Sequence, residues 1–208
     1  MLELCAYLKP KLEELQDLVV DNKIFVERTA NVGVLPLSTA INFGTSGPIL
    51  RGSGLRFDLR RVEGYSVYSE LDFDIPIGEG LAGTQGDCWD RNYVRVRECW
   101  ESIRIVEQCA QRLLGEHRRT PEFAPQATVP KQIRPKAKDL YFRAENPKGE
   151  LGFFFRSKGK GDVPYRVKAR GPSFCNLSVL RELSQGVLFA DLIAIVGSLD
   201  FVMGEVDR

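Results

Sequence analysis

The last nine residues of the chain combine three carboxylates with an arginine in an apolar setting. Asp200, Glu205 and Asp207 are separated by apolar side chains in GSLDFVMGEVDR, and Arg208 is the final residue. Apolar surroundings raise the pKa of a carboxyl group and a nearby cation lowers it, so such a set is suited to proton transfer. The alternative is a solvated tail, and the pattern alone leaves both interpretations open.

Two further stretches place charge where it could act chemically. Asp191 lies in VLFADLIAIV, where apolar residues flank it on both sides. An ionised carboxylate there needs a cation or hydrogen bonds, and we expect a structural ion pair. The segment ENPKGE combines Lys148 with Glu145 and Glu150. Its composition is typical of a hairpin turn, for which exposed charges are the simpler interpretation.

Other catalytic arrangements have little support in the sequence. The chain has one histidine, His117, which argues against Ser-His-Asp and Cys-His catalysis. GTSGPILRGSG lacks the glycine spacing of a dinucleotide-binding loop. The cysteines are odd in number and form no C-x-x-C pair, which argues against disulfides and a metal site and favours a reducing compartment. We expect each of them to be a small buried apolar residue: Cys5, Cys88, Cys99, Cys109 and Cys175.

Composition and charge describe a soluble globular protein. The 208 residues are 43% hydrophobic and 27% charged, which is enough for a substantial core. A formal net charge of +1 provides no general attraction to nucleic acid or anionic lipid. The most apolar stretch, 187–196, is shorter than the roughly 18–20 residues that span a membrane, and it contains Asp191.

The elements that must position these charges begin with a helix predicted over residues 1–21. Its apolar stripe comprises Leu4, Leu8, Leu12, Leu15 and Val19.

Residues 22–87 follow as an irregular, loop-rich region without a clean period. Within this region, ELDFDIP alternates apolar and polar residues and predicts a short strand.

A long helix is predicted over residues 88–114, with Asp87 as its N-cap. One of its stripes is polar and ionisable, and it is either a solvated face or a buried polar seam between helices. The stripe comprises Arg91, Arg95, Glu98 and Ser102.

The remainder of the chain alternates a linker, strands and helices. Four prolines mark 115–138 as a linker, three strand-like runs over 139–170 predict a small antiparallel sheet, and 173–208 contains the C-terminal helices and the terminal motif. The fold class predicted is α+β, a helical bundle with a small inserted antiparallel β-sheet.

Five stretches, in order along the chain, carry a family resemblance. They are SGPILRGSGLRFDLRR, GDCWDRNYVRVRECWESIRIVEQC, ENPKGELG, PYRVKARGPSF and ADLIAIVGSLDFVMGEVDR. Together they resemble the C-terminal half of the D subunit of NADH-quinone oxidoreductase, or respiratory complex I, a large subunit related to nickel–iron hydrogenases. The resemblance covers residues 1–208 and implies the C-terminal half of the hydrogenase-large-subunit-like fold.

The resemblance also implies a function. The chain would help to form the cavity where a quinone, the substrate, is reduced beside the terminal iron–sulfur cluster of a partner subunit, in electron transfer coupled to proton translocation. It would bind no cofactor itself, and NADH would be oxidised elsewhere in the complex. Unlike hydrogenase relatives, the terminal motif has no cysteine or histidine, so no metal site is expected.

The resemblance assigns roles to individual residues in two groups. Asp200, Lys148 and Arg208 would be catalytic, and Glu205 and Asp207 would join Arg208 in a buried polar terminus. The residues lining or bordering the quinone cavity would be Phe201, Val202 and Met203.

Partners and location follow from the same resemblance. The expected partners are the iron–sulfur B subunit, the C subunit, the membrane H subunit and the N-terminal half of the D subunit itself, with quinone as ligand and no nucleic acid. The expected location is peripheral, on the cytoplasmic face of a bacterial inner membrane or the matrix side of a mitochondrial one.

The family's chain is about twice as long as this one. Its N-terminal half carries the histidine-bearing loop and the tyrosine that contact the quinone headgroup, so no activity is expected of this chain alone. A truncated product and one half of a split subunit are both compatible with the sequence. The alternative function is a non-catalytic assembly or interaction module derived from the D subunit.

Overall fold

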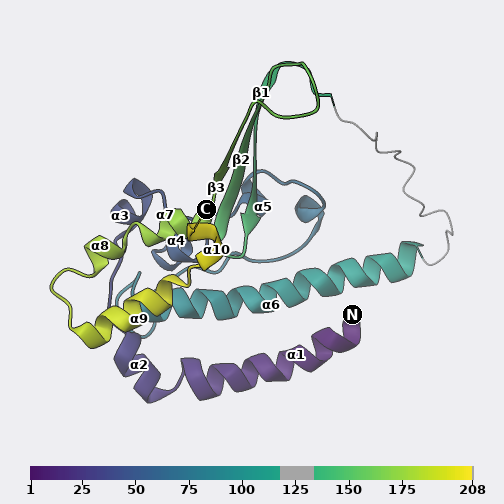
Figure 1. Ribbon diagram of the computed structural model, residues 1–208. Helices are drawn as coiled ribbons and strands as arrows, with labels where there is room; N and C mark the ends of the chain where they lie inside the picture. The colour runs from purple at the N-terminus through teal and green to yellow at the C-terminus, as the bar shows by residue number, and fades with distance from the viewer. Residues whose placement is uncertain (118–133, 208) are drawn as a thin grey trace.

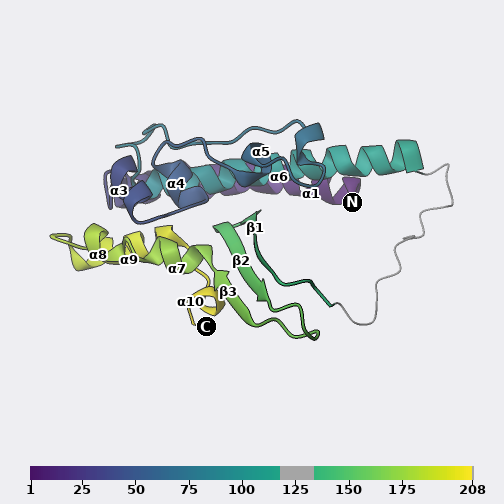
Figure 2. The ribbon, with the colours of Figure 1, turned by 90° about the horizontal axis from the view of Figure 1, so that it is seen from above.

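The computed structural model describes residues 1–117 and 134–207 (Figures 1 and 2). Helices and one small three-stranded antiparallel sheet make up the described part, which confirms the α+β prediction. The longest helix, α6 (Cys88–Arg112), has α1 (Leu2–Leu15) along one side. No helix in the described part is long and apolar enough to cross a membrane.

The start of α6 follows the prediction. The Asp87 carboxylate accepts a hydrogen bond from the Asp90 amide at 2.9 Å, as an N-cap does. Its other oxygen accepts from the Asn31 amide at 2.8 Å. The cap therefore also fixes the loop that precedes α3 (Leu37–Asn42).

The helix predicted over residues 1–21 is present as α1. α1 continues as a π-helical segment, Gln16–Val20, and it buries Cys5 and Val20. Most of its apolar stripe is exposed, and part of the stripe lines a cleft beside α6. The exposed members are Leu4, Leu8, Leu15 and Val19.

The region predicted as irregular and loop-rich contains short helices between its loops. They are α2 (Lys23–Thr29), α3, α4 (Pro48–Gly52), α5 (Leu59–Val62) and a 3₁₀ turn (Tyr68–Glu70).

The strand predicted at ELDFDIP is not formed. Leu71, Phe73 and Ile75 are buried, as their alternation predicted. The amides of Asp72 and Asp74 donate instead to side chains of α6, Gln108 at 2.9 Å and Glu101 at 2.8 Å. An extended segment packed on a helix has no ladder partner, so alternation alone does not make it a strand.

The sheet has the order β1-β2-β3, in which β1 (Lys138–Asn146) pairs with β2 (Gly149–Ser157), and β2 pairs with β3 (Arg166–Arg170). The register places Asn146 opposite Gly149, so Pro147 and Lys148 form the turn. Gly149 has φ +128°, and a Cβ there would lie 2.5 Å from Ser46 Oγ. Glycine therefore allows this turn to press against the segment before α4.

Four short helices complete the chain: α7 (Pro172–Leu177), α8 (Leu180–Leu183), α9 (Phe189–Leu199) and α10 (Met203–Val206). Part of the predicted linker, 118–133, lies outside the described residues.

The main apolar core joins α3, α4, α6, α8 and α9. Its buried residues are Leu35, Ala40, Ile49, Leu50, Cys88, Val179, Leu183, Ile195 and Leu199.

The cysteines only partly match their prediction. All five are free thiols, and Cys5 and Cys88 are buried. Cys109 and Cys175 are half-buried, and Cys99 is exposed on α6. Cys99 lies on α6 beside a cleft between α6 and α1, and α1 does not cover it. The sequence could not show this.

Candidate functional site

The turn between β1 and β2 brings Lys148 to Asp200. Lys148 Nζ donates to Asp200 Oδ2, and Arg95 Nε lies 3.2 Å from the same oxygen. Asp200 follows α9 with φ +48°, a left-handed conformation that is uncommon for a residue with a side chain. The backbone thus directs one carboxylate at two cations from separate elements, and two of the three residues predicted as catalytic, Lys148 and Asp200, lie side by side.

Arg95 supports this pair from α6. Its guanidinium donates to the Ser198 carbonyl at 2.6 Å and to the Arg91 carbonyl at 3.1 Å. Its buried Nε makes an ion pair with Asp200 but lacks the alignment of a hydrogen bond. Burial lowers the pKa of Arg95 to about 10, although the Asp200 carboxylate opposes this shift.

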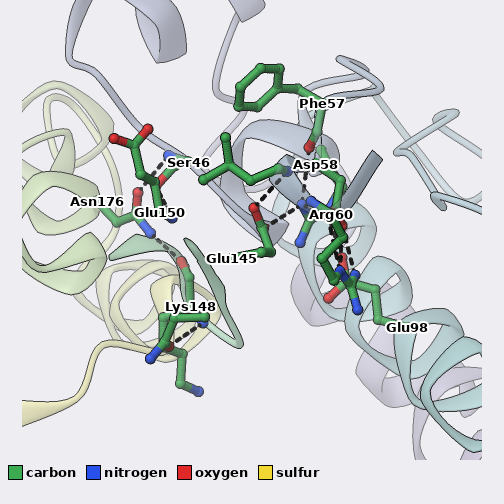
Figure 3. Close-up of polar contacts among 12 residues, drawn as sticks. Ser46, Phe57, Asp58, Arg60, Glu98, Glu145, Lys148, Glu150 and Asn176 are labelled. Carbon is green, nitrogen blue, oxygen red and sulfur yellow. Dashed lines mark hydrogen bonds and ion pairs between the residues drawn. The ribbon is translucent and has the colours of Figure 1, made fainter. Parts of the chain in front are cut away.

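The backbone of the turn is held by Asn176, which is 1% exposed. The Asn176 amide group donates to the Lys148 carbonyl at 3.0 Å and accepts from the Ser46 amide at 3.0 Å (Figure 3). On the other side of the turn, the Glu150 amide donates to Ser46 Oγ at 3.0 Å. Lys148 is therefore presented from a fixed backbone, and Asn176 is a site residue that the sequence did not reveal.

Replacing Asn176 with alanine is expected to lower the free energy of unfolding by about 2–3 kcal/mol, because the Ser46 amide and the Lys148 carbonyl lose their partner in a buried setting. Urea denaturation of the chain measures this loss. The exposed Asn42→Ala change is the control and should have little effect. Equal stability of the two variants would show that the bridge is not needed to hold the turn.

A buried cluster of charges centred on Arg51 lies behind the turn. Arg51 is 1% exposed, and its guanidinium donates to Glu98 at 2.6 Å and to Glu145 at 2.8 Å. Figure 3 labels these two carboxylates. The same guanidinium donates to the Phe57 carbonyl at 3.0 Å and lies 3.5 Å from Asp58. Glu98 belongs to the polar stripe of α6 and is half-buried, so the stripe contacts a buried partner at this level.

Burial and charge act in opposite directions on the cluster. Burial alone would lower the pKa of Arg51, and the carboxylates of Glu98 and Glu145 raise it overall. Burial raises the pKa of Glu145 even though Arg51 opposes the shift. Burial would also raise the pKa of Asp58, but its hydrogen bonds with Arg60 lower it. Of Glu145 and Asp58, Glu145 is therefore the carboxyl group that holds a proton more readily.

A cavity of about 340 Å³ lies between the Arg51 cluster and the Lys148–Asp200 pair. Cations and carboxylates line it in similar numbers, together with Tyr68, Cys99 and Ser102. Such a cavity can hold a small polar group or several waters and can move a proton between carboxyl groups. The charged residues that line it are Arg51, Arg60, Arg95, Glu98, Glu145, Lys148 and Asp200.

The three residues predicted to line or border a quinone cavity do not line this one. Phe201 packs on the apolar core, and Val202 and Met203 are exposed. None of these three lines the cavity, and their contribution to a quinone-binding wall stays a prediction. Arg208 lies outside the described residues.

The terminal carboxylates differ from one another. Glu205 accepts a hydrogen bond from the Ser173 amide at 3.0 Å, which ties α10 to the start of α7. Asp207 is exposed, so its predicted place in a buried polar terminus is wrong. Helix α10 ends at Val206, and the side chain of Asp207, which follows it, is exposed to solvent.

The prediction for Asp191 is confirmed. It forms an ion pair with Arg28 of α2 at 3.4 Å.

No group of three or more His, Cys, Asp or Glu residues in the described part of the chain could hold a metal ion.

Comparisons with known proteins give a consistent result. The family model described as "Respiratory-chain NADH dehydrogenase, 49 Kd subunit" matches residues 1–208. The NADH-quinone oxidoreductase D subunit numbered 1 of Cytophaga hutchinsonii is 67% identical over 98% of this chain and 52% of its own length. The D subunit of Amoebophilus asiaticus is 63% identical over 100% of the chain and 51% of its length, and that of Chlorobium phaeovibrioides is 51% identical over the same shares. The chain spans about half the length of the curated relatives it matches.

Proposed function

The chain belongs to the family of the 49 kDa subunit of respiratory-chain NADH dehydrogenase, and on that premise we propose that it is the C-terminal half of a D subunit that helps to reduce a quinone. The observation that carries the proposal is the Lys148–Asp200 pair, with Arg95, at a cavity of about 340 Å³. In this proposal the chain has the hydrogenase-large-subunit-like fold. Electrons come from NADH oxidised elsewhere, through an iron–sulfur cluster held by a partner subunit.

Reduction of a quinone to a quinol takes up two electrons and two protons. The electrons come from the partner, and the residues of this chain act on charge and protons. Lys148 and Arg95 stabilise the negative charge that develops on a quinone oxygen as electrons arrive. Each of the two quinone oxygens also gains a proton. Asp200, between these cations, relays one proton from solvent to the oxygen beside it, and the second proton reaches the other oxygen from solvent.

The remaining assignments complete the proposal. The exposed apolar side chains of Val202 and Met203, next to the packed Phe201, provide a wall for a quinone tail. Arg208 is proposed as a second cation of the site on the basis of the family resemblance.

The proposed partners are the B, C and H subunits of the complex and the N-terminal half of the D subunit. The proposed location is the cytoplasmic face of a bacterial inner membrane, or the matrix side of a mitochondrial one. The proposal places the chain there as a peripheral protein, held through these partners.

The test uses the chain assembled with the N-terminal half and the cluster-bearing subunit. Lys148→Met and Asp200→Asn are each expected to lower NADH:quinone reductase turnover by about 10- to 100-fold, because each removes a charge that acts on the reacting oxygen. Electron transfer to an artificial one-electron acceptor, which needs no proton delivery at this site, should be retained.

Lys160→Met is the matched control, because Lys160 is exposed in the turn between β2 and β3. Turnover and KM for quinone should be unchanged in this variant. If the Lys148 and Asp200 variants assemble and also retain full turnover, the site assignment is wrong and the chain is a non-catalytic assembly module.

A further inference from the structure

The polar cavity has two ends of opposite net charge. Among the described residues, the end at the β1–β2 turn has one cation in excess, because Lys148 and Arg95 share Asp200. At the other end, two arginines meet three carboxylates, so one carboxylate is in excess. An excess cation favours negative charge on a bound group, and an excess carboxylate favours uptake of a proton. The ionisable residues of this second end are Arg51, Arg60, Asp58, Glu98 and Glu145.

The three carboxylates of the second end differ in burial and in access to the cavity. Asp58 accepts from the Arg60 guanidinium at 2.6 Å and from the Arg60 amide at 2.9 Å, and it does not line the cavity. Glu98 lines the cavity, but its side chain is 17% exposed, so water helps to solvate its charge. Glu145 lines the cavity with a side chain that is 5% exposed. Glu145 therefore combines contact with the cavity and the stronger loss of solvation.

The Glu145 carboxylate is held in a fixed position. Its Oε1 accepts from Arg51 at 2.8 Å and its Oε2 accepts from the Leu59 amide at 3.1 Å. Each oxygen keeps a lone pair, so the group can take up a proton without moving. Burial raises the pKa of Glu145, although Arg51 opposes this shift. The charged or titratable groups around it are Arg51 on α4, Asp58 and Arg60 at α5, Tyr65 after α5, Glu98 on α6 and, across the cavity, Lys148 and Asp200.

One hairpin connects the two ends of the cavity. Glu145 lies near the end of β1 and Lys148 lies in the turn, and the cavity is also lined by Asn146 and Pro147 between them. In the view of Figure 3, Glu145 lies between Lys148 on one side and Glu98 on the other. A group bound beside Lys148 can therefore exchange a proton with Glu145 through water in the same cavity.

We propose that Glu145 is the relay for the second proton of quinone reduction and delivers it to the quinone oxygen farther from Lys148. This inference rests on the proposed function. The O–H bond of protonated Glu145 breaks as an O–H bond forms on that oxygen, with cavity water between them. The carboxylate then takes up a proton from solvent. Because both electrons come from the partner subunit and Asp200 supplies the other proton, the formation of quinol is balanced.

The first test uses the chain assembled with the N-terminal half and the cluster-bearing subunit. Glu145→Gln keeps the shape of the side chain and an oxygen that accepts from Arg51, but it cannot carry a proton. We expect quinone reductase turnover to fall about tenfold with little change in KM for quinone, because a proton route is lost and a binding contact is not. Glu145→Asp should retain more turnover than Glu145→Gln.

Added acetate separates a lost proton route from a structural defect. As a small carboxylate it can enter the cavity and carry the proton in place of the missing side chain. It should raise the turnover of Glu145→Gln several-fold and leave that of the unmodified assembly unchanged. Glu107→Gln is the matched control, because Glu107 is half-buried, pairs with Lys9 at 2.8 Å and does not line the cavity. Its turnover should be normal with and without acetate.

A second readout does not depend on quinone reduction. Infrared difference spectra of the 208-residue chain, recorded as a function of pH, detect the C=O stretch of protonated carboxyl groups. We expect one carboxyl band that persists to higher pH than the bands of the exposed carboxyl groups, because burial favours the neutral form of Glu145. This band should be absent from Glu145→Gln and present in Glu107→Gln.

The possible results separate this inference from the proposed function. Full turnover in Glu145→Gln, while Lys148→Met and Asp200→Asn lose theirs, would overturn the relay and leave the proposed function intact. A loss that acetate does not restore, or a Glu145 band that titrates with the exposed carboxyl groups, would also overturn it. A tenfold loss in Glu98→Gln with full turnover in Glu145→Gln would assign the relay to Glu98 instead. Full turnover in the Lys148 and Asp200 variants would overturn the proposed function and the relay together.

Discussion

Replacing Arg51 with methionine is expected to lower the free energy of unfolding at pH 7 by about 3–5 kcal/mol, the largest effect of any single change discussed for this chain. Arg51 is 1% exposed and is the shared cation of Glu98, Glu145 and Asp58. Methionine fills a similar length but leaves these carboxylates without their common partner. The loss measures the cost of unpaired buried charge and does not measure the strength of any one ion pair.

The loss should depend on pH in a definite direction. Without Arg51 the pKa values of the neighbouring carboxyl groups rise, and the pKa of Glu145 is already raised by burial. The folded variant therefore binds more protons than the folded wild type. The two unfolded chains bind nearly the same number of protons. By linkage the stability difference grows as pH rises and shrinks as pH falls. Urea denaturation at pH 5 and at pH 8 should give the smaller deficit at pH 5.

Arg104→Met is the matched control for this experiment. Arg104 also has three carboxylate partners, Asp72, Asp74 and Glu101, but it lies at the surface, where ion pairs contribute little. The control should show little change at either pH. A deficit in Arg51→Met that is equal at both pH values, or no greater than that of Arg104→Met, would refute the account of the buried cluster.

The sequence predicted those features that depend on neighbours along the chain. The N-cap at Asp87, the hairpin turn at Lys148 and the ion-pairing of Asp191 follow from local residue types and burial. Lys148 and Asp200 were brought into one site by the family resemblance. Spacing could not do this, because 52 positions separate them.

The features that the sequence missed depend on distant partners. Asn176 holds Ser46, which lies 130 positions away, and nothing in SFCNLS distinguishes this asparagine from a solvated one. Arg51 likewise meets Glu145 across 94 positions. The stripe of α1 was correctly identified as apolar, but periodicity does not reveal which body covers a face. Within the described residues most of that face is exposed.

Arg91→Met is expected to have the second largest effect, a loss of about 2–4 kcal/mol, through a different mechanism. Arg91 is fully buried and donates to the carbonyls of Gly33 at 3.0 Å and Gly86 at 2.6 Å and to Ser198 Oγ at 2.9 Å. In the described part of the chain no carboxylate lies within ion-pair distance of it. Burial accordingly lowers the pKa of Arg91.

The methionine variant leaves neutral carbonyl groups unsatisfied and does not leave a carboxylate unpaired at contact distance. Its deficit, measured by urea denaturation, should therefore vary much less between pH 5 and pH 8 than that of Arg51→Met. Arg91→Lys keeps the charge but cannot reach Gly33, Gly86 and Ser198 together, so it should lose nearly as much stability. The exposed Arg97→Met on the same helix is the control. If Arg91→Lys keeps full stability, the positive charge of Arg91, and not its set of guanidinium donors, holds α6 to α9. That contact is what places Asp200, at the end of α9, beside Lys148.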